Sequence, residues 1–479
     1  MRSWSPERIA SAADARLRAP LRSGTPGPRT PPPDARRPTG SSEAGPDRAI
    51  IDSREAGPGA LFIGLPGAHT DGGAFAARAL SAGAWGVLVA PEHIERARRA
   101  GSGVLFAAED PLAALQRLAA AWRRDLDAQV IGITGSTGKT STKDLLLAVL
   151  GAHRRTVASR LNFNTEVGLP LEILSAPPGT EVLVLEMGMR GPGQIAQLAR
   201  IAQPQVGVIV SIGPVHLERL GSVAAIAAAK AELIAALPAG GTAVVPAGEP
   251  LLEPHLRGDI EIVTFGDGGD VQLHAADGGR IEIDLSGRPI RLEVPFSQAH
   301  QRTNLLAAVA AARAVGVIAA GRLEPRLSPG RGQRVALRDG ITIIDDCYNA
   351  NPVSMRAALD DLADTAARED HTRAVAVLGD MLELGSDART YHLEIGEHAG
   401  TVGVDVLVTV GSLAAAMGER FDGEVHAVVD AGEAAAIVAE LLAPGDAVLV
   451  KGSRGVGLEL VCRGLQASRL STDVAGADR

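Results

Sequence analysis

Short runs of Val and Ile alternate with Ala- and Leu-rich segments of helical periodicity along most of this 479-residue chain. This alternation is typical of α/β folds, in which each buried strand is followed by a helix that covers a face of the sheet. Hydrophobic residues make up 46% of the chain but aromatic residues only 3%. We therefore expect an α/β protein whose cores are built mainly from Ala, Val, Leu and Ile.

The length and the spacing of these runs predict three domains. At about 100–200 residues per domain, the chain has room for roughly three. We place them at residues 1–127, 128–325 and 326–470, with a Gly- and Arg-rich linker from Gly321 to Gly332. In the third domain the alternation predicts a doubly wound sheet. The expected strands are Ala60–Gly64, Gly86–Ala90, Val130–Thr134, Val182–Glu186, Val206–Ser211, Thr242–Pro246, Thr342–Asp346, Ala374–Leu378, Val406–Val410 and Ala447–Lys451.

Two segments have a composition that does not favour folding. Residues 20–46 are rich in Pro, Gly, Ser and Arg and predict a disordered insertion in the first domain. Residues 471–479 predict a loose tail.

Charge, cysteine content and hydropathy exclude several classes of protein. The net charge of −9 has the wrong sign for general nucleic-acid binding. With only Cys347 and Cys462, neither a disulfide framework nor a cysteine-based zinc site is expected. No run of 18 apolar residues predicts a membrane span, and the N-terminus has no apolar stretch like that of a signal peptide. We expect a soluble cytoplasmic protein.

One glycine-rich turn predicts nucleotide binding. The residues Gly135, Ser136, Thr137, Gly138, Lys139, Thr140 and Ser141 join an apolar strand to a predicted helix at 142–150. Backbone N–H groups in such a turn point at phosphates, and the helix N-terminus favours their negative charge. Lys139 is expected to reach the terminal phosphates and Thr140 to bind Mg²⁺. The strict P-loop pattern has a glycine in place of Ile133, so an ordinary strand-to-helix turn is the competing interpretation.

Three polar residues further along the chain are candidates for the same site. Glu186 ends a predicted strand, where α/β sheets place ligands, and its carboxylate could bind Mg²⁺. His216 follows another strand and could be a second ligand, and Lys230 lies in a predicted helix at 223–236. Taken singly, these residues are better explained as a surface acid, a loop histidine and a solvated lysine. Their occurrence beside the P-loop favours the functional interpretation.

Several motifs together are similar to those of the ATP-dependent Mur ligases, and within them to the MurF branch. The matching stretches are Gly135–Ser141, Leu185–Gly188, Gly213–Ser222 with Lys230, Asp345–Pro352, Val377–Gly385, Lys451–Arg454 and Asp52–Arg54. The resemblance covers the chain from about residue 50 to about residue 465. It departs from the family pattern at Gly73, Thr165, Ala299 and Cys347, where the family usually has His, Asn, Gly and Ser.

The resemblance implies a fold of three domains: an N-terminal α/β domain for a UDP-sugar, a central P-loop ATPase domain with a mostly parallel sheet, and a C-terminal Rossmann-like domain that closes over ATP. It implies an ADP-forming ligase that joins D-alanyl-D-alanine to UDP-N-acetylmuramoyl-tripeptide through an acyl phosphate, for peptidoglycan synthesis. ATP and Mg²⁺ are the implied cofactors, and both substrates are small molecules. We expect a monomer that binds no nucleic acid.

The resemblance also implies roles for individual residues. Lys139, Lys230, Glu186 and His216 are expected to be catalytic, with Thr140, Glu186, His216 and a carbamylated Lys230 holding metal. Residues 135–141 with Asn304, Arg331 and Asp346 are expected to bind ATP. The expected substrate-binding residues are Asp52, Ser53, Arg54, Asn162, Asn164, Thr165, Tyr348, Asn349 and Asn351.

Three alternatives stay open at this point. A sister ligase that adds diaminopimelate or lysine would share the ATPase block, but its usual Asp-Asn-Pro-Arg motif is absent. A folylpolyglutamate-type ligase would lack the motifs at 346–352 and 379–385. A P-loop kinase or a non-catalytic nucleotide-binding module is the alternative from a different class. The identity of the third peptide residue, diaminopimelate or lysine, is not determined by the sequence.

Overall fold

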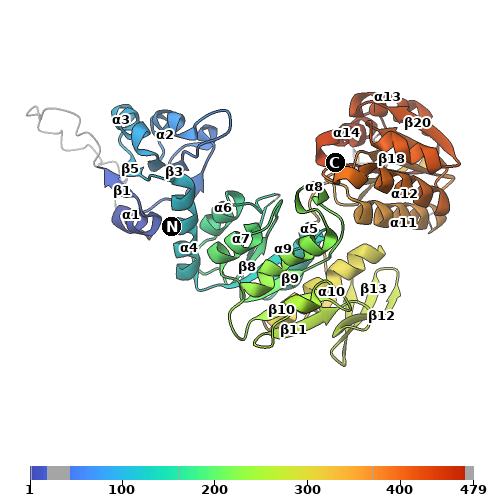
Figure 1. The fold of residues 1–479 in the computed structure, drawn as a ribbon, viewed down its shortest axis with the longest axis horizontal. Coiled ribbons are helices and arrows are strands. Elements are labelled where there is room, and N and C mark those ends of the chain that lie inside the picture. Colours follow the sequence, from blue (N-terminus) through green and yellow to red (C-terminus); the bar gives the residue numbers. More distant parts are fainter. Residues whose placement is uncertain (2, 19–43, 161, 369–370, 470–479) are drawn as a thin grey trace, which may run out of the picture. The chain divides into compact units, whose positions relative to one another are not determined.

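The computed structural model describes residues 1, 3–18, 44–160, 162–368 and 371–469 (Figure 1). The predicted insertion falls mainly on residues 19–43 and the predicted tail on 471–479, so both predictions lie outside the described residues. Contact density divides the chain into two compact units. The first comprises Met1–Gly132, Arg154–Met187 and Ala196–Gln205, and the second comprises Ile133–His153, Gly188–Ile195 and Val206–Arg479. The prediction of three domains stays a proposal.

A five-stranded sheet with the order β1-β5-β4-β3-β2 forms the core of the first unit. Strands β2 to β5 are parallel, and β1 runs antiparallel to β5. The two strands expected here are β3 and β4, and both are fully buried. The strands are β1 (Arg16–Arg18), β2 (Arg48–Ile50), β3 (Ala60–Ile63), β4 (Gly86–Val89) and β5 (Val104–Ala107). The helices are α1 (Pro6–Ala13), α2 (Ala76–Ser81), α3 (Pro91–Ala100) and α4 (Pro111–Leu126).

The N-terminal residues belong to this unit through aromatic packing. The Trp4 ring packs edge-on against Trp122 of α4, with 5.4 Å between the centroids. The Trp4 indole N–H donates to Asp125 at 2.8 Å, which satisfies its polar end. Helix α4 begins where the Asp110 carboxylate accepts from two backbone N–H groups, with Pro111 at the first helical position. Sequence patterns did not indicate α1 or β1.

A ten-stranded sheet carries the P-loop region, with the order β15-β14-β13-β12-β11-β10-β9-β6-β8-β7. Strands β7 and β8 belong to the first unit, and β9 to β15 belong to the second. Its strands are β6 (Gln129–Thr134), β7 (Thr156–Ala158), β8 (Val182–Glu186), β9 (Val206–Ile209), β10 (Thr242–Pro246), β11 (Glu261–Phe265), β12 (Val271–Asp277), β13 (Arg280–Leu285), β14 (Arg288–Glu293) and β15 (Gly321–Arg322). The associated helices are α5 (Lys139–Gly151), α6 (Gly168–Ser175), α7 (Gln194–Ala202), α8 (Leu217–Leu220), α9 (Val223–Ala235) and α10 (Ala299–Ala314).

The parallel pairs β9–β10 and β10–β11 agree with the expected parallel sheet, but β12, β13 and β14 form an antiparallel meander. The sequence does not indicate this meander, because β13 and β14 alternate more buried and more exposed residues instead of forming continuous apolar runs. The expected linker at 321–332 is also partly wrong, since β15 pairs in parallel with β14.

A six-stranded sheet in the second unit has the order β16-β17-β21-β18-β19-β20, and all neighbours are parallel except β16 and β17. The strands are β16 (Gln333–Ala336), β17 (Thr342–Asp346), β18 (Arg373–Gly379), β19 (Val406–Val410), β20 (Glu424–Val428) and β21 (Asp446–Lys451). The helices are α11 (Pro352–Arg368), α12 (Ala388–Thr401), α13 (Ala431–Leu441) and α14 (Glu459–Arg469).

Two separate aliphatic clusters show that helices cover both faces of this sheet. Val375 and Val377 of β18 pack in one cluster with residues of α13 and α14. Ala376 and Leu378, which alternate with them, pack in the other cluster with residues of α11 and α12. Successive residues of a strand point to opposite faces, so the expectation of a doubly wound sheet is confirmed.

Two boundaries near the P-loop differ from those expected. Helix α5 begins at Lys139, not at residue 142, directly after Gly138 in the left-handed conformation (φ 78°). Strand β9 ends at Ile209 instead of Ser211, and the Ser211 carbonyl accepts from the Ser136 N–H of the P-loop. Among the described residues, no helix is both long and apolar enough to cross a membrane.

Candidate active site

The glycine turn between β6 and α5 is held from both sides by hydrogen bonds. The Thr137 N–H donates to Ser211 Oγ at 2.9 Å, and the Ser136 hydroxyl donates to the Gly213 carbonyl at 2.9 Å. Lys139 Nζ donates to the Gly135 carbonyl at 2.7 Å, so the ammonium lies over the turn. These bonds organise the turn as the sequence predicts for a phosphate-binding loop.

Residues from distant parts of the second unit line one pocket with this turn. Residues 136–141 share the pocket with Asn304, Arg331, Asp346 and Lys451. A side-chain Cβ at Gly138 would collide with Asn304 Oδ1, so glycine at this position allows α10 to approach the turn. The structure therefore brings the three predicted nucleotide-binding residues of later segments to the P-loop.

Arg331 connects the P-loop to the segment that follows β17. Its guanidinium donates to Thr140 Oγ1 at 3.2 Å and lies 4.1 Å from the centroid of the Tyr348 ring. Arg454 lies over the same ring at 5.1 Å. Cation–π contacts of this kind hold a guanidinium in place while leaving part of its donors for a ligand.

Asp346 forms an ion pair with Lys451, 2.5 Å from Nζ to Oδ2. Lys451 is only 2% exposed and also donates to the Asn349 carbonyl at 3.0 Å. Asn351 accepts from the Ser354 N–H at 2.9 Å, and both Asn349 and Asn351 line the pocket. The residues expected to bind substrate at 349 and 351 thus lie beside the expected nucleotide-binding residues.

Lys230 is buried in α9, with 2% of its surface exposed. Burial lowers the pKa of Lys230 well below its usual range, and the nearby Lys139 ammonium lowers it further. The amine is therefore easily held in its neutral form. The alternative of a solvated helix-face lysine is wrong.

His216 lies at the start of α8 in the left-handed backbone region, with φ 53°. Its Nδ1 contacts the Glu383 carboxylate. Burial lowers the pKa of His216, Glu383 opposes this shift, and Lys139 and Lys230 add to it. These influences place His216, Lys139 and Lys230 in one electrostatic environment. A neutral imidazole is the form that can bind a metal.

Glu186 is buried at the end of β8, in the first unit, where the Asn164 side-chain amide donates to its Oε1 at 2.8 Å. Its backbone N–H donates to Ser159 Oγ at 3.0 Å. Asn162 and Thr165 lie in the same loop: the Asn162 carbonyl accepts from the Asn164 N–H at 2.8 Å, and Thr165 Oγ1 accepts from the Gly168 N–H at 3.3 Å. Through this loop, Asn164, a predicted substrate-binding residue, contacts Glu186, a predicted metal ligand.

The predicted substrate-binding residues Asp52, Ser53 and Arg54 form a local turn in the first unit. Asp52 accepts from the Arg54 backbone N–H and pairs with the Arg54 guanidinium, which lowers the pKa of Asp52 to about 2. Gly73, where the family pattern has histidine, has no room for a side chain because the His93 ring fills the adjacent space. His93 Nε2 pairs with Asp71 at 2.7 Å.

Three residues of the site had no predicted role. Lys451 and Glu383 lie inside motifs that the sequence singled out, but their partners, Asp346 and His216, are distant in the chain. His300 lines the pocket, and burial lowers its pKa. Only folding reveals these pairings.

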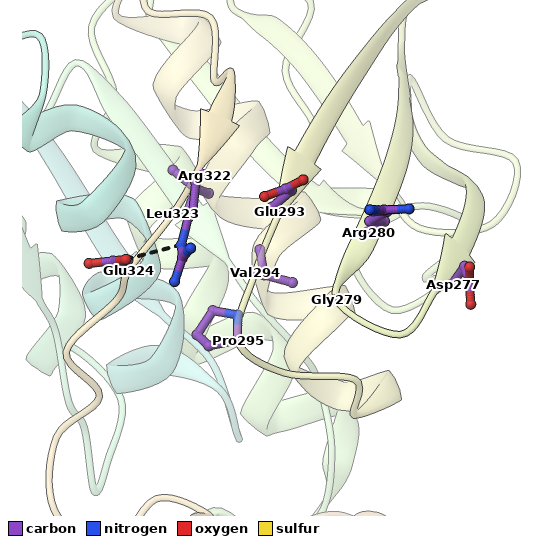
Figure 2. Close-up of a pocket in the computed structure, with 9 residues that line it drawn as sticks. All are labelled: Asp277, Gly279, Arg280, Glu293, Val294, Pro295, Arg322, Leu323 and Glu324. Atoms are coloured by element: carbon purple, nitrogen blue, oxygen red, sulfur yellow. Dashed lines mark ion pairs between the residues drawn. The ribbon is translucent and has the colours of Figure 1, made fainter.

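A second pocket of about 390 Å³ lies at the antiparallel end of the ten-stranded sheet. Figure 2 shows its charged lining, in which Arg322 and Glu324 form an ion pair of 3.0 Å near Glu293, with Arg280 and Asp277 further along the rim. None of the residues expected in the active site lines it.

Comparison with known proteins gives consistent matches. The Mur ligase middle domain matches residues 133–312, and the Mur ligase glutamate ligase domain matches residues 330–454. A UDP-N-acetylmuramoyl-tripeptide–D-alanyl-D-alanine ligase of Mycobacterium tuberculosis is 40% identical, over 90% of this chain and 93% of that protein. The crystal structure of MurF from Acinetobacter baumannii has a TM-score of 0.82 at 27% identity, covering 97% of this chain and 99% of that one. MurF from Thermotoga maritima in complex with ADP has a TM-score of 0.76 at 28% identity, covering 88% and 97%.

Proposed function

Because this chain belongs to the Mur ligase family, in the branch of the UDP-N-acetylmuramoyl-tripeptide–D-alanyl-D-alanine ligases, we propose that it joins D-alanyl-D-alanine to UDP-N-acetylmuramoyl-tripeptide while ATP becomes ADP and phosphate. One observation carries the proposal: the P-loop, Asn304, Arg331 and Asp346 line a single pocket. The ADP complex of the Thermotoga maritima relative supports ATP as the nucleotide.

The first chemical step is transfer of the ATP γ-phosphoryl group to the terminal carboxylate of the tripeptide. The carboxylate and the phosphates repel each other, so cations must lie beside both. Lys139 provides one at the glycine turn, and the Arg331 guanidinium, fixed on Tyr348, provides another. Because both cations are already in place before the reaction, they stabilise the negative charge that develops on the transferred phosphoryl group.

Thr140, Glu186 and His216 are the groups that we propose to hold Mg²⁺. The Thr140 hydroxyl and the buried Glu186 carboxylate are oxygen donors of the kind that Mg²⁺ prefers, and a neutral His216 leaves a ring nitrogen available. The donor chemistry fits this ion. Mg²⁺ supplies charge neutralisation on the phosphate oxygens when it is bound.

Lys230 is proposed to carry a carbamate. Its neutral Nζ attacks CO₂, an N–C bond forms and one proton is released, which converts a buried base into an oxygen ligand. The depressed pKa of Lys230 supports this step, because the amine must be neutral to react. The resulting anion places a negative charge near the Lys139 ammonium.

In the second step, the amine of D-alanyl-D-alanine attacks the acyl phosphate and phosphate leaves. Binding both reactants in one site supplies proximity and limits hydrolysis of the acyl phosphate. Tyr348, Asn349 and Asn351 are proposed to contact the substrates. Asn349 and Asn351 line the pocket with Arg331 and Lys451, and the Tyr348 ring packs against the Arg331 guanidinium.

An ADP-release assay tests the proposal. ADP should form only when UDP-N-acetylmuramoyl-tripeptide and D-alanyl-D-alanine are both present, and omission of either should stop turnover. ADP formation with an unrelated acceptor alone would instead indicate a kinase. Parallel assays with the diaminopimelate and the lysine tripeptide identify the third residue that the enzyme accepts.

The cellular setting is part of the same proposal. We infer a cytoplasmic, monomeric enzyme of peptidoglycan synthesis, needed for cell shape and division. The acidic composition and the absence of a long apolar run in the sequence support a cytoplasmic location. Gel filtration of the purified protein tests the monomeric state.

A further inference from the structure

The two cysteines of the chain meet beside the six-stranded sheet although they lie far apart in the sequence. Cys347 directly follows β17, and Cys462 lies on α14. Both are buried, with 6% and 2% of their surfaces exposed. Their two sulfur atoms and a carboxylate oxygen of Asp345 all lie within 4.8 Å of one another.

The surroundings of this cluster hold its side chains in place and leave one side open to water. Both cysteines pack in an aliphatic core that includes Leu458, which precedes α14, and Val461 of α14. The Cys347 N–H donates to Asp345 Oδ1 at 3.3 Å, which keeps the carboxylate beside the thiol. Asp345 is partly exposed, so an ion can reach the cluster from its side.

We propose that Asp345, Cys347 and Cys462 form a binding site for one thiophilic divalent cation, Zn²⁺ or Cd²⁺. Two sulfur donors and one carboxylate are a set that suits these ions, and the fourth tetrahedral position falls to water. Ligand atoms at about 2.0–2.3 Å from zinc lie roughly 3–4 Å apart, so the cluster needs only small side-chain movements. Binding releases the two thiol protons to solvent.

This site is distinct from the proposed magnesium site, because Mg²⁺ prefers oxygen donors and binds thiolates poorly. It lies next to the nucleotide pocket in the chain: Cys347 stands between Asp346, which pairs with Lys451, and Tyr348, which supports Arg331. A bound cation would tie this segment to α14. The inference does not depend on the proposed ligase activity.

The test uses the full-length protein, purified with a reductant and then freed of metal with a chelator. Titration with Cd²⁺ in excess Mg²⁺ should produce a thiolate-to-cadmium charge-transfer band in the ultraviolet that saturates at one Cd²⁺ per chain. Addition of Zn²⁺ should abolish the band. Because the chain has only two cysteines, the band reports on this pair alone.

Variants separate the three ligands. Cys347→Ala and Cys462→Ala should each remove the saturable band, while circular dichroism shows that they fold. Asp345→Asn should keep a band but weaken Cd²⁺ binding about tenfold or more. Asp364→Asn removes an exposed carboxylate of α11 as the matched control and should bind like the parent. The proposal is wrong if the folded parent gives no saturable band, if Cys462→Ala retains it, or if the two aspartate variants weaken binding equally.

Discussion

The chain has only four lysines, and apart from its histidines all its other basic residues are arginines. Lys139 and Lys451 line the proposed nucleotide pocket, and Lys230 is close enough to Lys139 to be affected by its charge. Lys143 lies on the same helix as Lys139 and pairs with Asp144 at 3.0 Å. A lysine can lose its charge when it is buried, whereas an arginine cannot, and the lowered pKa of Lys230 shows this difference at one of the four positions.

Replacement of Lys139 by alanine should lower the rate of ADP formation on the order of 10²-fold or more. The variant lacks a positive charge that the parent holds ready beside the phosphates. The folded structure should be retained, since the Lys139 ammonium donates to the Gly135 carbonyl within the same turn. Steady-state kinetics and thermal melting measure the two effects. Arg389→Ala, which removes an exposed pair with Glu419, serves as the control. A folded Lys139→Ala protein with parental rates would contradict the P-loop assignment.

Incubation with ¹³C-labelled bicarbonate should give one carbamate resonance in the ¹³C NMR spectrum of the parent and none in Lys230→Ala. Lys230→Ala should also lose about 10²-fold in kcat. Small added carboxylates should restore part of the rate by supplying the missing oxygen ligand. The physical basis for carbamylation is that burial favours the neutral amine of Lys230, which is the form that reacts with CO₂. A spectrum that is identical in both proteins would exclude carbamylation.

The segment after β18 is held by a histidine that must stay neutral. His392 Nε2 accepts from the Met381 N–H at 2.9 Å, and burial lowers the pKa of His392. Below about pH 6.5 the unfolded chain takes up a proton that the folded chain does not, so the free energy of unfolding falls as the pH falls. Urea unfolding at pH 7.5 and 5.5 should show a smaller decrease for His392→Gln than for the parent. Equal decreases would show that His392 does not contribute.

The segment between β15 and β16 depends on two side chains to present Arg331. Gln333 Nε2 donates to the Ser328 carbonyl at 2.6 Å, and its Oε1 accepts from the Arg331 N–H at 2.8 Å. Asp144 of α5 accepts from the Ser328 N–H at 2.7 Å. These bonds tie the segment to the helix that follows the P-loop.

Gln333→Ala should raise the KM for ATP roughly fivefold with a smaller change in kcat, because it frees the Arg331 N–H from its acceptor and one such hydrogen bond contributes about 1 kcal/mol. Steady-state kinetics with ATP as the varied substrate provides the measurement. Gln272→Ala removes a comparable turn contact, to the Gly268 N–H on the antiparallel meander, and should leave KM unchanged. An equal change in both variants would indicate a general loss of stability.

Hydrogen exchange of the whole chain can separate the two ligand sites. A non-hydrolysable ATP analogue should protect residues 135–141 and 345–351, because both segments contribute residues to the lining of one pocket. UDP-N-acetylmuramoyl-tripeptide should protect residues 52–54, whose exposed turn carries the paired Asp52 and Arg54. Protection of 52–54 by the nucleotide alone would contradict the division of roles between the two units.

The sequence by itself determined the α/β class, most strands of the six-stranded sheet and the glycine turn that we propose to bind phosphate. These features are local: continuous apolar runs mark buried parallel strands, and a glycine followed by Lys139 and Thr140 forms a turn whose geometry depends on adjacent residues. The antiparallel meander was not predicted, because its half-exposed strands lack such runs.

Only the tertiary structure decided which distant side chains meet. The contact of His216 with Glu383, the ion pair of Asp346 with Lys451 and the cluster of Cys347 with Cys462 all join separate segments. Two isolated cysteines predicted no metal site, yet folding brings them together with Asp345. The burial of Lys230, which distinguishes it from a solvated surface lysine, is likewise visible only in the folded structure. Such pairings and shifts arise from packing between elements, and no local pattern of residues encodes them.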